Sequence, residues 1–128
     1  MGDGILRKEA EKQGKVFGFV KDVRPYILGS RFVFTSGYLG ILEAIACKKL
    51  VFSVYDNPLK RDYLRLSPLA PWIIIEPEPA KLAEKIIFYQ EHPEEENKLI
   101  EAGYDWVKKQ SWEKTTEIYS RLWSRIPL

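Results

Sequence analysis

Short apolar runs alternate with segments of helical spacing along the chain, and this alternation most strongly constrains the fold. The runs occupy residues 16–20, 32–34, 50–55 and 72–75. Parallel strands that are buried on both faces read as continuous apolar runs, and helices connect them. The sequence therefore predicts an α/β fold with a mostly parallel sheet of about four strands, flanking helices and right-handed crossovers.

The segments between and after the runs carry signals for helix starts and ends. Helices are expected over residues 5–13, 22–28, 39–47, 57–66, 81–91, 93–106 and 111–122. Asp22, Asn57 and Ser111 stand at N-cap positions, and Pro58 and Pro93 stand at first helical positions, where their missing N–H is not needed. Residues 1–128 are expected to form a single domain, with an α/β part over residues 1–76 and a helical tail over residues 77–128.

A glycine-bearing loop leads from the second apolar run into the next helix. Ser36, Gly37 and Gly40 follow a strand, at the sheet edge where parallel α/β proteins usually bind ligands. The backbone at the two glycines is able to approach a phosphate closely, next to the amides of a helix start. Glu43 comes later in the helix, and its carboxylate suits hydrogen bonds from vicinal sugar hydroxyls. The alternative for Glu43 is a solvated or helix-stabilising glutamate.

Three other residues have side chains of possible chemical interest. Lys60 and Arg61 follow the third apolar run and would face a diphosphate at the same edge, or would form an exposed helix flank. Cys47 is the only cysteine, which excludes an intramolecular disulfide and fits a reducing cytoplasm. Its place in an apolar helix is typical of a buried small hydrophobe. The sequence indicates no metal site and no cofactor.

Composition excludes several classes of partner. The 128 residues include 20 basic and 18 acidic ones, and the net charge of +2 gives no basis for nucleic acid or a membrane surface. No run reaches the roughly 18–20 apolar residues of a transmembrane helix, and the start is unlike a signal peptide. A cytoplasmic protein is therefore expected. Its richness in Lys, Glu and Ile is typical of thermophiles.

Several of these segments together resemble a known family. Residues 42–47 (LEAIAC), residues 16–20 (VFGFV), the Gly2-Asp3-Gly4 turn and the Ser111-Trp112 pair look like the nucleotide-sugar-binding, C-terminal domain of retaining GT-B glycosyltransferases. The resemblance extends along nearly the whole chain. It implies a partial Rossmann-like sheet and binding of a UDP-, GDP- or ADP-sugar.

The resemblance also implies roles for individual residues. Glu43 would hold the ribose hydroxyls of the donor, and Phe19 or Val20 would lie near the base. Backbone amides of the loop and helix start would surround the diphosphate, from Ser36, Gly37, Tyr38, Leu39 and Gly40. No catalytic residue is assigned.

The chain departs from the family pattern in ways that change the expected function. The family has two glutamates with seven residues between them, but Thr35 stands where the first would be, and the loop to Glu43 is about four residues shorter. The family's preceding strand-helix-strand unit, which supplies an Arg and a Lys to the diphosphate, has no counterpart here, nor has the acceptor domain. The expected function is therefore donor binding, with transfer only alongside an acceptor-binding domain. The alternative is a non-catalytic interaction module.

The missing unit also predicts self-association. The family places two strands between residues 16–20 and residues 32–35, so their loss would leave apolar sheet edges uncovered. The expected partners are therefore a second copy of the chain or a separately encoded acceptor domain.

Overall fold

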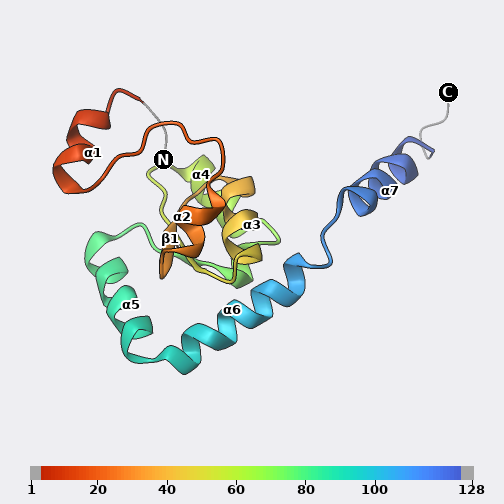
Figure 1. The fold of residues 1–128 in the computed structure, drawn as a ribbon. Helices are drawn as coiled ribbons and strands as arrows, with labels where there is room; N and C mark the ends of the chain where they lie inside the picture. The colour runs from red at the N-terminus through yellow and green to blue at the C-terminus, as the bar shows by residue number, and fades with distance from the viewer. Residues whose placement is uncertain (1–3, 125–128) are drawn as a thin grey trace.

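The computed structural model describes residues 4–124 and contains a parallel sheet of three strands within that range (Figure 1). The strands are β1 (Phe32–Phe34), β2 (Leu50–Ser53) and β3 (Ile74–Ile75), in the spatial order β1-β2-β3. Val33 pairs with Val51, and Phe52 pairs with Ile74. The predicted α/β class with a parallel sheet and flanking helices is confirmed. The number of strands is three rather than four.

The predicted strand over residues 16–20 is wrong. This segment contains only a single-residue bridge at Gly18, whose φ of +68° lies in the left-handed region and interrupts an extended run. The ring of Phe17 packs on Tyr26 with 4.7 Å between ring centroids. The apolar side chain of Phe17 therefore packs on the following helix and not on a neighbouring strand. As a result, β1 is an end strand of the sheet. Gly2 and Asp3 of the proposed glycine turn lie outside the described residues.

The described chain also contains helices close to the predicted ranges. They are α1 (Arg7–Gln13), α2 (Arg24–Leu28), α3 (Tyr38–Ala46), α4 (Pro58–Arg65), α5 (Pro79–Glu91), α6 (Pro93–Val107) and α7 (Trp112–Trp123), with a 3₁₀ turn over Ala70–Trp72. Two of the three predicted N-caps are confirmed, because Asn57 Oδ1 accepts from the Lys60 amide at 2.8 Å and Ser111 Oγ accepts from the Lys114 amide at 3.2 Å. The predicted cap at Asp22 is wrong by one position: the N-cap of α2 is Val23, and Asp22 Oδ1 accepts from the Arg24 amide at 3.0 Å.

The main core lies between one face of the sheet and the helices α3, α4 and α6. Its buried members are Ile41, Ala44, Ile45, Val51, Leu64, Leu69, Ile73 and Val107. Gly103 lets α6 come close, because a Cβ there would stand 3.3 Å from both Ile45 Cγ2 and Trp72 Cβ. The core thus fixes α6 on the α3 side of β2.

The opposite face of the sheet is aromatic. Phe52 is fully buried, with the rings of Phe32 and Phe34 each 5.3 Å away between centroids. The ring of Tyr89 in α5 packs on Phe52, with 6.3 Å between the two ring centroids. This face is held by ring packing, and Phe34 at its margin stays exposed.

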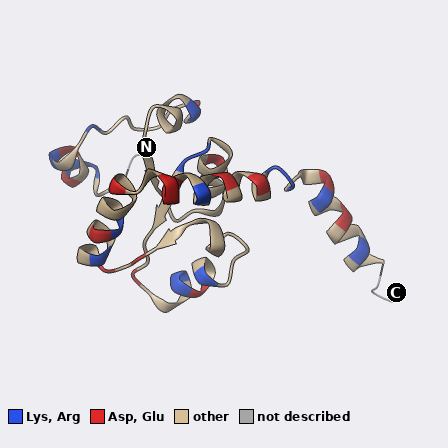
Figure 2. Cartoon of the chain, turned by 90° about the horizontal axis from the view of Figure 1, so that it is seen from below, with Lys and Arg blue, Asp and Glu red and all other residues tan. Residues whose placement is uncertain are grey.

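The C-terminal part is helical, as predicted. Helices α5 and α6 lie against the sheet body, whereas α7 extends away from it beyond a short connector (Figure 1). Figure 2 shows acidic and basic residues interspersed along α6 and α7. No helix within residues 4–124 combines the length and hydrophobicity that a membrane-spanning segment requires.

Candidate functional site

A hollow of about 550 Å³ lies at the carboxyl ends of the three strands. The loops after β1, β2 and β3 and the first turns of α4 and α5 supply its walls. The lining residues are Ser36, Val54, Tyr55, Asp56, Asn57, Lys60, Pro77, Pro79 and Leu82. Open parallel sheets bind their ligands at this edge, so the fold and the hollow indicate the same place.

Lys60 is the cation in this hollow, and its position is well defined. Its ammonium donates a hydrogen bond to the Ser36 carbonyl at 2.5 Å and lies 4.4 Å from the centre of the Tyr63 ring. The Ser36 hydroxyl in turn donates to the Val54 carbonyl at 2.9 Å, which ties the loop after β1 to the loop after β2. The structure therefore brings Ser36 and Lys60 together, two residues expected to face a diphosphate.

The start of α3 stands next to this cation. Two of its amides are already used, because Tyr38 N donates to the Tyr63 hydroxyl at 3.0 Å and Gly37 N makes a long contact to Thr35 Oγ1 at 3.5 Å. The amides of Leu39 and Gly40 donate to no group of the described chain. An anion at this end of α3 would thus find two amides, not the whole expected set.

The two glycines of the loop differ in what they do. A Cβ on Gly40 would stand 2.9 Å from Thr35 Oγ1, so Gly40 is required by the close packing of α3 on the end of β1. A Cβ on Gly37 would meet nothing within 4 Å, and its φ of −88° is open to any residue. Close packing within the protein therefore accounts for Gly40.

Glu43 lies away from this hollow. It is exposed in the second half of α3 and lines a different hollow of about 470 Å³ between α3 and α6. The other residues there are Leu42, Ala46, Tyr104, Val107, Lys108 and Gln110, none of which lines the first hollow. The structure therefore does not bring Glu43 together with Ser36 and Lys60 in one cavity.

Arg61 does not line the hollow that contains Lys60. Its Nε donates to Asp62 Oδ1 at 2.9 Å, and this hydrogen bond is the main reason that the pKa of the Arg61 guanidinium is raised. Arg61 lines a neighbouring hollow of about 270 Å³ with Tyr55, Asp56, Asn57 and Pro58. It borders the strand-end site without entering the first hollow.

The two residues expected near the base line none of these three hollows. Phe19 is 85% exposed, and Val20 is half-buried. They belong to residues 16–20, which form no strand because Gly18 has a left-handed conformation.

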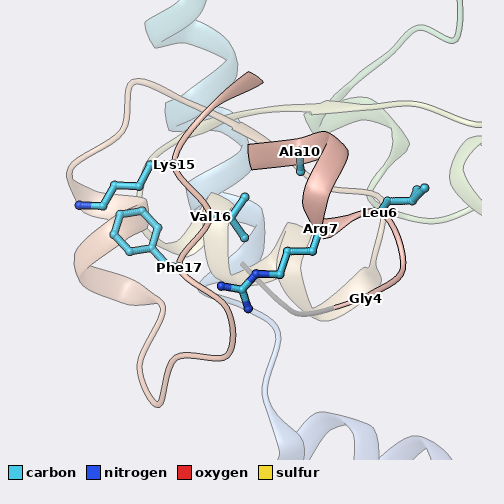
Figure 3. Close-up of a pocket in the computed structure, with 7 residues that line it drawn as sticks. All are labelled: Gly4, Leu6, Arg7, Ala10, Lys15, Val16 and Phe17. Carbon is cyan, nitrogen blue, oxygen red and sulfur yellow. The ribbon is translucent and has the colours of Figure 1, made fainter. Parts of the chain in front are cut away.

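A fourth hollow, of about 320 Å³, lies in the N-terminal segment (Figure 3). Its lining residues are Gly4, Leu6, Arg7, Ala10, Lys15, Val16 and Phe17. The ammonium of Lys15 lies 4.7 Å from the centre of the Phe17 ring. This hollow contains none of the predicted site residues and does not reach the strand ends.

One acidic group at the strand-end edge is neutralised by a partner. Glu76 directly follows β3, and its Oε2 accepts from the Lys85 ammonium at 2.7 Å. This hydrogen bond is the largest cause of the lowered pKa of Glu76. Asp56 is then the carboxylate among the lining residues of the first hollow.

Tyr63 contacts the candidate site but was not among the residues predicted for it. Its ring lies against Lys60, and its hydroxyl accepts a hydrogen bond from the Tyr38 amide at the start of α3. The signal was its spacing, because residues three apart on a helix are neighbours.

Within residues 4–124 no group of three or more His, Cys, Asp and Glu side chains is arranged to hold a metal ion. Compared with protein-family models, with curated proteins and with solved structures, the chain gives no significant match.

Proposed function

We propose that this chain is the nucleotide-sugar-binding half of a glycosyltransferase, which transfers a glycosyl group from an activated donor when an acceptor-binding domain is present. The observation that carries the proposal is the strand-end hollow, in which the Lys60 ammonium sits on the Ser36 carbonyl beside the start of α3. A cation and free helix amides at the carboxyl edge of a parallel sheet suit a diphosphate. The resemblance of residues 42–47 to the GT-B donor domain supports the same ligand class.

The diphosphate would bind to Lys60 and to the amides of Leu39 and Gly40. Lys60 would act as a point charge, with N–H groups beyond the one that holds Ser36. Glu43 would accept hydrogen bonds from ribose hydroxyls. Since Glu43 lies six residues beyond Gly37, or about 9 Å along the helix axis, the nucleoside would have to lie along the outside of α3.

Calorimetry with UDP, GDP and ADP and with their sugars tests this proposal. A ligand that binds only the native state also raises the unfolding temperature, which gives a rapid first screen. A charged hydrogen bond is worth about 1.5–3 kcal/mol, so Lys60→Gln is expected to weaken the best ligand about tenfold or more. Lys98→Gln, which removes the same charge from an exposed site on α6, is the matched control and should not change the affinity.

The role of Glu43 is tested separately. Glu43→Gln is also expected to weaken the nucleotide about tenfold, because the loss of one charged acceptor has a similar cost. If Lys60→Gln weakens binding and Glu43→Gln does not, the diphosphate site stands and the ribose lies elsewhere. If no nucleoside diphosphate binds at millimolar concentration, the proposed donor site is wrong.

A second candidate function is a non-catalytic interaction module. The observation that favours it is α7, which contains no buried residue and extends from the body. A module of this kind would bind a protein partner through α7 and would show no stabilisation by nucleotides.

A further inference from the structure

Helix α7 has an apolar stripe without cover. Written as a heptad with Trp112 at position a, the helix has Thr115 at d, Tyr119 at a and Leu122 at d, flanked by Ile118 and Trp123. The exposed fractions are 79% for Trp112, 69% for Trp123 and 51–54% for Ile118, Tyr119 and Leu122. Bulky apolar side chains in one row that remain exposed to this degree indicate an interaction surface.

We infer that α7 pairs with α7 of a second copy of this chain, as an antiparallel two-fold helix pair. The exposed apolar area of α7 is large enough for such a pair. An aromatic side chain buries about 150–250 Å², so the exposed parts of the five apolar residues amount to about 600 Å² in each copy. Two copies would bury about 1,200 Å² in total, which is at the lower end of stable specific interfaces. We expect the dimer to form at micromolar concentration.

The charges of α7 favour a copy of itself over a membrane surface. The four charged residues Glu113, Lys114, Glu117 and Arg121 fall at heptad positions b, c and f, so none interrupts the stripe. Two are acidic and two are basic, whereas helices that lie on anionic membranes have a polar face rich in Lys and Arg. Figure 2 shows both signs along α7.

Side-chain size favours the antiparallel direction. In that register Trp112 lies opposite Leu122 of the other copy, and Thr115 lies opposite Tyr119, so each layer has one larger and one smaller side chain. A parallel pair would place Tyr119 against Tyr119 and Thr115 against Thr115, which gives one overfilled and one underfilled layer. The antiparallel pair also opposes the two helix dipoles favourably.

The first test is the mass of the full chain by sedimentation at micromolar concentration. We expect a species of twice 15.0 kDa that dissociates on dilution. Leu122→Glu, in the stripe, should give the monomer at concentrations where the original chain is dimeric. Lys114→Glu, on the outer face, is the matched control and should leave the dimer intact. A single 15.0 kDa species of the original chain throughout the micromolar range would overturn the inference.

The second test fixes the direction of the pair and does not depend on weakening it. In a Cys47→Ser background, one chain has Thr115→Cys and another has Tyr119→Cys. The antiparallel register places these two positions opposite each other, so the mixture should form a disulfide-linked heterodimer. Each chain alone should not cross-link, because its own cysteines would be offset by about 6 Å along axes 8–10 Å apart, beyond disulfide reach. Cross-linking of either chain with itself, or a dimer in which the mixture does not cross-link, would overturn the antiparallel pair.

Discussion

At the scale of single residues, Gly40 shows how close packing is distinguished from ligand binding. Alanine is favoured over glycine in a helix by about 1 kcal/mol, but a Cβ here would stand 2.9 Å from Thr35 Oγ1. Overpacking typically costs about 1–3 kcal/mol, so Gly40→Ala is expected to lower the free energy of unfolding by about 1 kcal/mol. Denaturant unfolding followed by circular dichroism measures the change.

Thr35→Ala provides the control for this prediction. With the hydroxyl gone, the added methyl group meets no close atom of residue 35 beyond its Cβ at 3.7 Å, so Gly40→Ala should become neutral or stabilising in that background. Gly37→Ala, where a Cβ meets nothing, should have little effect. An unchanged cost of Gly40→Ala in both backgrounds would show that Thr35 is not the obstacle.

Part of the candidate site was predictable from single residues and their spacing. The N-cap at Asn57 and the helix start at Pro58 follow from local backbone chemistry, and they place Lys60 in the first turn of α4. Spacing alone does not show which side chains contact each other across the sheet edge. The contact from Lys60 to the Ser36 carbonyl joins segments 24 residues apart, and the separation of Glu43 into another hollow depends on where α6 packs.

At the scale of elements, one arginine ties three segments together. Arg31, just before β1, donates from one nitrogen to the Glu96 carboxylate of α6 at 2.8 Å and to the carbonyls of Tyr89 and Gln90 in α5 at 3.2 and 3.4 Å. Glu96 is buried, whereas the Arg31 side chain is half exposed. The pair therefore holds the corner between α5 and α6 against the sheet.

Arg31→Met is expected to lower the free energy of unfolding by about 1–2 kcal/mol, because it leaves the Glu96 carboxylate buried without its partner, with solvent at Arg31 reducing the loss. The double variant Arg31→Met with Glu96→Gln should recover part of the loss. Lys98→Met breaks an exposed pair with Glu95 and should cost at most about 0.5 kcal/mol. Equal losses for Arg31→Met and Lys98→Met would mean that burial of Glu96 does not matter.

The elements were predicted unevenly, and the physical reason is clear. Residues 32–34 form β1 because a continuous apolar run between two helical segments is buried most favourably in a parallel sheet. Residues 16–20 are also rich in Phe and Val but contain Gly18, which has a positive φ, and Phe17 packs against Tyr26 instead of a neighbouring strand. An apolar run therefore predicts burial more securely than it predicts strand pairing.

At the scale of the whole molecule, the arrangement in Figure 1 separates a packed body from α7. The buried core residues all lie between residues 27 and 107, and α7 contributes none of them. By contrast α6 supplies Val107 to the core and packs Gly103 against Ile45 and Trp72. The two C-terminal helices should therefore differ sharply in what their loss does to folding.

A chain that ends after residue 110 is expected to unfold in one cooperative transition, because its core is complete. At a concentration where both chains are monomeric, so that pairing adds nothing by mass action, its unfolding temperature should lie within about 5 °C of that of the full chain. Calorimetry measures both quantities. A chain that ends after residue 91 lacks α6 and should show no cooperative transition. If removal of α7 alone abolished the transition, α7 would have to pack on the body in solution, and its apolar stripe would not be available to a second copy.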